Sequence, residues 1–93
     1  MTADPARLLL RTLRRSAIDA GCAIDLEHEA EIPWASATFV GAQHRVVVTG
    51  EAVGAWLAAL PDADLSVRQH FVASVDVAAT TTGALLTVLV LEA

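Results

Sequence analysis

Residues 24–32, with the sequence IDLEHEAEI, place an acidic side chain at every second position, and this pattern restricts the fold more than any other in the chain. Successive side chains of a β-strand point to opposite faces of a sheet, so a period of two is typical of a strand buried on one face only. Regular alternation places His28 on the buried face with the apolar residues. The opposite face then carries a row of carboxylates, here called the acidic row: Asp25, Glu27, Glu29 and Glu31.

The acidic row is interpreted first as the solvated side of the strand, whose charges also discourage edge-to-edge pairing with other chains. A metal ion needs ligands that converge on one point, whereas side chains two residues apart on a strand are rooted about 6.5 to 7 Å apart. His28 is directed to the other face, so we predict no metal site and no cofactor. The alternative is a docking surface for arginines, either Arg45 of the same sheet or those of a neighbouring subunit. Acid catalysis is the least favoured interpretation.

Residues 5–20 are predicted to form a helix. Asp4 can cap free backbone amides and Pro5 suits the first helical position, while Gly21 is a natural C-terminal stop. The arginines of this segment lie mainly outside its apolar stripe. The stripe, with spacings of three and four, consists of Leu9, Leu10, Leu13, Ala17 and Ile18.

A hairpin is predicted after Pro33, which ends the first strand because proline lacks the amide that a central ladder needs. The pair Gly41-Ala42 suits a two-residue type II′ turn, and this turn sets Phe39 opposite His44. His44 then lies beside the turn, at the edge of the sheet. One face of the hairpin is predicted to carry Trp34, Ser36, Thr38, Gln43, Arg45 and Thr49.

A second helix is predicted from Thr49 or Gly50 to a stop at residues 61–64, with the sequence PDAD. Its buried stripe consists of Val53, Trp56, Leu57 and Leu60. Residues 65–77 again alternate with a period of two. Residues 84–92 are apolar on both faces, which is typical of a strand at the centre of its sheet or pressed against another subunit.

The predicted order is helix, three strands, helix and two strands, within a single small domain that spans residues 1–93. This order indicates an α+β fold in which an antiparallel-rich sheet packs both helices on one face. The other face of the sheet is then left without a cover in the chain itself.

Composition predicts self-association. A chain of this size has a thin core and usually gains stability from disulfides, metals or a partner chain. Cys22 is the lone cysteine, which excludes an internal disulfide, and no cluster of cysteine and histidine suits a structural zinc ion. The chain is 55% apolar and only 18% charged. We therefore expect a homodimer or a larger homo-oligomer, with a second protein as an additional partner.

Net charge and hydropathy indicate which partners and which cellular compartment to expect for the protein. The net charge of −5 argues against nucleic acid, because phosphate binding needs a basic surface. The longest uncharged stretch, residues 77–91, is too short for a membrane-spanning helix, and the first residues lack the order of a signal peptide. We expect a soluble cytoplasmic protein without a membrane partner. All six basic residues are arginines, a bias that suggests a GC-rich bacterial genome.

Arg45 and its neighbours are the first candidate site. An arginine bordered by hydroxyls and a tryptophan could bind an anionic small molecule or a peptide carboxylate. The same face could instead form the polar layer of a dimer interface, or be plain surface. The candidate residues are Trp34, Ser36, Thr38 and Arg45.

Arg68 and His70 are the second candidates, on a polar strand face that also includes Ser74 and Asp76. A hairpin centred on Thr81 would set His70 opposite Glu92, and a carboxylate can orient a histidine as a general base. No nucleophile or glycine-rich elbow accompanies His70 in the sequence. A cross-strand polar pair is therefore the favoured interpretation.

No motif in the sequence defines a reaction. The leading functional hypothesis is a non-enzymatic module that associates with itself and with another protein through the open face or the edges of its sheet. The alternative is a small protein or enzyme that binds an anionic ligand on the face with Trp34, Thr38 and Arg45. The sequence leans toward the first hypothesis because it contains no catalytic constellation.

Overall fold

The computed structural model describes residues 4–93, and its first element is the helix α1 (Pro5–Asp19). The carboxylate of Asp4 accepts a hydrogen bond from the backbone N–H of Ala6 at 3.0 Å, and Gly21 has a φ of 78° just after the helix. Both predicted ends are confirmed within one residue. The stripe is confirmed at Leu9, Leu13 and Ala17, which have no exposed surface, but Ile18 is 64% exposed and does not belong to it.

Five antiparallel strands form one sheet in the order β1-β2-β5-β4-β3. The strands are β1 (Ile24–Ala35), β2 (Val40–Gly50), β3 (Ser66–Val67), β4 (His70–Ala79) and β5 (Gly83–Glu92). The α+β class is confirmed, and β5 is central, which is one of the two alternatives that its doubly apolar sequence left open. The order differs from the prediction, because two strands precede the second helix and three follow it.

The second helix, α2 (Gly54–Ala59), continues as a short 3-10 turn (Leu60–Asp62). It begins later than predicted because β2 extends through Thr49 to Gly50. Its predicted buried stripe is confirmed: Val53, Trp56, Leu57 and Leu60. No helix within residues 4–93 is long enough and apolar enough to cross a membrane.

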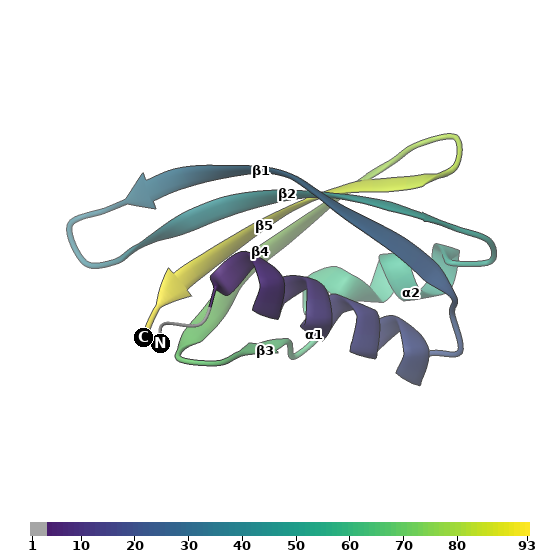
Figure 1. The fold of residues 1–93 in the computed structure, drawn as a ribbon, viewed down its shortest axis with the longest axis horizontal. Coiled ribbons are helices and arrows are strands. Elements are labelled where there is room, and N and C mark those ends of the chain that lie inside the picture. The colour runs from purple at the N-terminus through teal and green to yellow at the C-terminus, as the bar shows by residue number, and fades with distance from the viewer. Residues whose placement is uncertain (1–3) are drawn as a thin grey trace.

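Both helices lie on the same side of the sheet, which arches over them (Figure 1). The core fills the space between this side, here called the helix face, and the two helices. It includes Leu9 and Leu13 of α1, Val46 of β2 and Leu86 of β5. The opposite side, here called the open face, is not covered by any helix of residues 4–93 (Figure 1).

The predicted hairpin is wrong in its turn and its register. Pro33 does not end β1, and it is tolerated because β1 is an edge strand whose outer amides have no ladder partner. The turn lies instead at residues 36–39, where the hydroxyl of Ser36 accepts hydrogen bonds from the backbone N–H groups of Thr38 and Phe39. His44 therefore pairs with Glu31 rather than with Phe39.

Two β-bulges interrupt the alternation on which the predicted strand faces depended. One extra residue, Glu29, lies between His28 and Ala30 of β1, and another, Ala73, lies between Val72 and Ser74 of β4. A bulge adds one residue to one strand only, so side chains beyond it point to the opposite face from the one that simple alternation predicts.

Because of the bulges, three side chains point to a different face of the sheet from the one predicted. Glu31 leaves the acidic row and joins His28 on the helix face, since each pairs with a β2 residue of that face, His44 or Val46. Ile32 was predicted on the buried face and is 45% exposed. Simple alternation over residues 65–77 places Phe71 on the same face as Val75, but Phe71 is 38% exposed on the open face.

Candidate functional site

Two histidines meet on the helix face of neighbouring strands. His28 of β1 and His44 of β2 approach with Nε2 and Nδ1 2.9 Å apart, and their ring centroids are 5.2 Å apart. One ring donates an N–H and the other accepts it, so the pair satisfies a histidine that would otherwise be buried without a partner. His44 is only 1% exposed, which corrects its predicted place at the sheet edge.

Glu31 completes a cluster with the two histidines. Its Oε1 lies 3.7 Å from Nδ1 of His44, and its side chain remains 50% exposed. The bulge at Glu29 is the cause, because it turns Glu31 toward the face that holds His28. One donor atom from each of the three residues lies within 4.8 Å of the other two.

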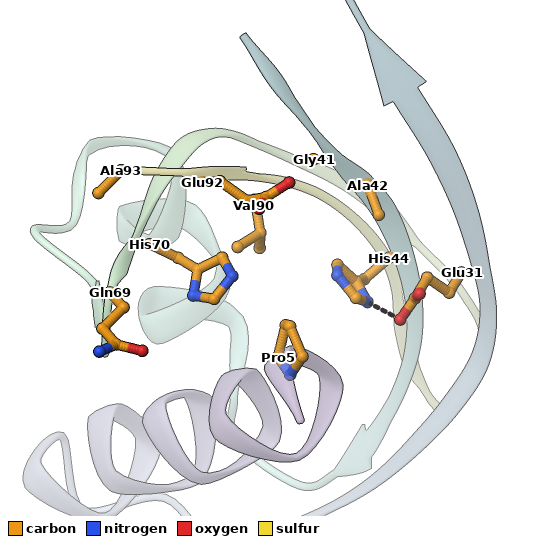
Figure 2. Close-up of a pocket in the computed structure, with 10 residues that line it drawn as sticks. All are labelled: Pro5, Glu31, Gly41, Ala42, His44, Gln69, His70, Val90, Glu92 and Ala93. Atoms are coloured by element: carbon orange, nitrogen blue, oxygen red, sulfur yellow. Dashed lines mark ion pairs between the residues drawn. The ribbon is translucent and has the colours of Figure 1, made fainter. Parts of the chain in front are cut away.

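The cluster borders a cavity of about 660 Å³ between the ends of β1, β2, β4 and β5 and the start of α1. Figure 2 shows His44 and His70 on opposite sides of this cavity, with Pro5 of α1 between them at its base. The contacts of His44 with His28 and Glu31 use Nδ1, and its other ring nitrogen points into the cavity (Figure 2). The lining residues are Pro5, Glu31, Gly41, Ala42, His44, Gln69, His70, Val90, Glu92 and Ala93.

Burial lowers the pKa of His44 below its ordinary value of 6.5. The carboxylate of Glu31 opposes this effect in part, and the neighbouring His28 lowers the pKa of His44 further. Burial therefore favours the neutral form of the His44 imidazole. A neutral imidazole keeps a nitrogen lone pair that can accept a proton or bind a metal ion.

His70 is the predicted candidate that the structure places at this cavity. It pairs with Glu92 across β4 and β5, as predicted. The register nearer the turn differs by one residue from a hairpin centred on Thr81, and the bulge at Ala73 restores the predicted pair. The bulge at Ala73 separates it from Ser74 and Asp76, which lie on the open face, so the predicted shared face is wrong. Nδ1 of His70 lies 2.8 Å from the carbonyl oxygen of Arg68, the turn residue between β3 and β4.

The other predicted candidates do not converge on one site. Trp34 and Arg45 both point to the open face, but Arg45 pairs with Ala30, about 13 Å along β1 from Trp34. Ser36 and Thr38 lie in the β1–β2 turn, away from the strand face that they were predicted to share with Arg45.

The acidic row is shorter than predicted. Asp25 and Glu27 pair with open-face positions of β2, Glu29 occupies the bulge, and Glu31 faces the histidines. Within residues 4–93, Glu31 is the one carboxylate of the acidic row with an ion-pair contact, which it makes to His44. No arginine of these residues lies within 4.0 Å of a carboxylate.

Comparisons with protein-family models, with curated proteins and with solved structures each find no match to this chain. Residue roles are therefore inferred from the geometry of the chain itself. Two features stand out in residues 4–93: the uncovered face of the sheet, and the cluster of His28, Glu31 and His44 beside the cavity.

Proposed function

We propose that this protein is a self-associating interaction module whose open face packs against the open face of a second copy. The central strand β5 presents Leu85 and Leu89 to this face, and Val47 of β2 lies beside Leu85. All three side chains are only half-buried in the single chain. Removal of such apolar surface from water is favourable by roughly 25 cal/mol per Å².

Aromatic residues extend the apolar surface toward one end of the open face. The rings of Phe39 and Phe71 form an edge-to-face pair with centroids 5.5 Å apart, and the two side chains are 43% and 38% exposed. Contiguous exposed apolar surface of this kind marks interaction sites on small proteins. Aromatic residues are also enriched in such interfaces.

The charges of the open face suit a second copy of the same chain. Arg45 of β2 and Asp76 of β4 both pair with Thr87, so they lie on either side of β5, each about 4.8 Å from it. A two-fold axis parallel to β5, between two stacked sheets, would bring Arg45 of each copy over Asp76 of the other. Symmetric interfaces need this kind of self-complementary surface.

The proposal depends on one observation. The apolar central strand β5 lies between Arg45 on one side and Asp76 on the other, and both pair with the same residue of β5. Two stacked sheets of this type lie about 10 Å apart. Leu85 and Leu89 of the two copies would then form the centre of the interface, and the reciprocal Arg45–Asp76 pairs would flank it.

Charge exchange tests the proposal. Arg45→Asp and Asp76→Arg each place like charges across the proposed interface, and the double variant restores opposite charges. Size-exclusion chromatography with light scattering is expected to show a dimer for the wild type and the double variant, and monomers for both single variants. The control is Arg14→Asp, on the exposed side of α1, which should leave the dimer intact.

Two results would refute the proposed function. One is a wild-type protein that stays monomeric at high micromolar concentration. The other is a dimer that neither single charge reversal weakens, because the open face would then not be its interface.

A further inference from the structure

The donor atoms of His28, Glu31 and His44 lie close enough together to converge on one metal ion. Zinc binds imidazole nitrogen and carboxylate oxygen at about 2.0 to 2.2 Å, and tetrahedral geometry then separates its ligand atoms by about 3.3 Å. The observed separations of 2.9 Å between the histidines and 3.7 Å between His44 and Glu31 lie on either side of this value. The third separation, between His28 and Glu31, lies within 4.8 Å, so side-chain shifts of up to about 1.5 Å would form the site.

The chemistry of these donors favours zinc over harder cations. Calcium and magnesium prefer oxygen ligands, whereas imidazole suits zinc and other late first-row metals.

The cluster lies on rigid parts of the fold rather than on loops. His44 is in β2, between the edge strand β1 and the central strand β5, and His28 and Glu31 are on β1 itself. The bulge at Glu29 supplies the register that brings Glu31 to the two histidines. Sites held by strands keep their ligands in position more accurately than sites held by loops.

We infer that His28 Nε2, His44 Nδ1 and a carboxylate oxygen of Glu31 form a zinc-binding site beside the cavity. Three protein ligands leave one tetrahedral position for a water molecule or for an oxygen or nitrogen atom of a small molecule. The side chain of Glu31 is half-exposed, so such a molecule would approach the ion from the side of this carboxylate. The site lies on the helix face and is independent of the proposed dimer interface on the open face.

Titration calorimetry with zinc chloride tests the inference on protein freed of metal by a chelator. One zinc ion per chain is expected to bind the wild type. Glu31→Gln preserves the shape of a half-exposed side chain and should weaken binding at least about tenfold, as should His28→Gln. Circular dichroism verifies that both variants remain folded.

Matched controls separate this site from adventitious zinc binding. Glu29→Gln removes the adjacent carboxylate of the same strand, and His70→Gln removes the histidine on the other side of the cavity. Both should bind zinc as the wild type does. Equal losses in Glu29→Gln and Glu31→Gln, or no stoichiometric binding by the wild type, would overturn the inference.

Cobalt provides a second readout that does not depend on affinity. Cobalt(II) in a tetrahedral nitrogen and oxygen site absorbs visible light far more strongly than octahedral cobalt in water does. The wild type and Arg45→Asp are expected to show this absorption, and Glu31→Gln is expected to lose it. A spectrum of octahedral cobalt in the wild type would contradict the proposed coordination.

Discussion

At position 41 the backbones of β2 and β5 approach so closely that a side chain larger than hydrogen does not fit. A Cβ atom built on Gly41 would lie 2.1 Å from the carbonyl oxygen of Val90 and 2.8 Å from Cα of Leu91. Both obstacles are backbone atoms, which cannot move without disturbing the ladder. Gly41 was predicted to form a turn, but it instead allows β2 and β5 to pack closely. It lies next to Ala42, at the rim of the cavity.

Gly41→Ala is expected to destabilise the protein by about 1 to 3 kcal/mol, the usual cost of a group forced into a filled space. Gly54→Ala is the matched control, because nothing lies within 4 Å of a Cβ at this first position of α2. Alanine there should leave stability unchanged or raise it by up to about 1 kcal/mol. Urea unfolding followed by circular dichroism measures both values, and an equal effect of the two substitutions would contradict the close approach at Gly41.

At the scale of elements, α2 depends on α1. A helix of six residues is far too short to be stable alone in water, so tertiary contacts must hold it. Trp56 supplies such a contact, because its indole N–H donates a hydrogen bond to the hydroxyl of Ser16 at 3.0 Å while its ring is 6% exposed in the core. This single bond links the two helices that cover the sheet.

A double-mutant cycle tests the link between α1 and α2. Ser16→Ala leaves the indole N–H without its partner and is expected to cost about 1 to 3 kcal/mol. Ser16→Ala in a Trp56→Phe background should lower the free energy of unfolding clearly less, because phenylalanine has no N–H group that would lose its hydrogen-bond partner. Thr81→Ala, at an exposed position of the turn between β4 and β5, should change the free energy of unfolding by less than about 0.5 kcal/mol. Additive effects of the two core substitutions would show that the bond contributes nothing.

At the scale of the whole molecule, the domain is built in two layers with one side left uncovered. Both helices pack on the helix face, and the chain has no third layer within residues 4–93 for the open face (Figure 1). A sheet with two apolar faces is more stable when both are covered. Stability and association should therefore be coupled in this protein.

Thermal unfolding should depend on protein concentration. If the native state is a dimer and the unfolded state is a monomer, mass action raises the Tm as the concentration rises. The Tm of the wild type is expected to increase over a hundredfold range of concentration, while that of Arg45→Asp stays constant and lower. Scanning fluorimetry through Trp34 and Trp56 measures both. A wild-type Tm that is independent of concentration would count against self-association.

Several elements could be predicted from the sequence because their signals are local. The ends of α1 follow from the preferences of Asp4, Pro5 and Gly21, which act within one helical turn. The central place of β5 agrees with one of the two alternatives that its apolar residues on both faces left open. Each of these signals lies within one segment or between neighbours in the chain.

The candidate site could not be predicted in this way, because its geometry depends on a mismatch between two strands. Nothing in residues 24–35 alone shows that Glu29 has no partner on β2, so alternation assigned Glu31 to the wrong face. The pairing of β1 with β2 decides this orientation, since a bulge is defined by two residues opposite one. The sequence thus determined the class of fold and the helix ends, whereas the meeting of His28, His44 and Glu31 is a property of strand pairing in three dimensions.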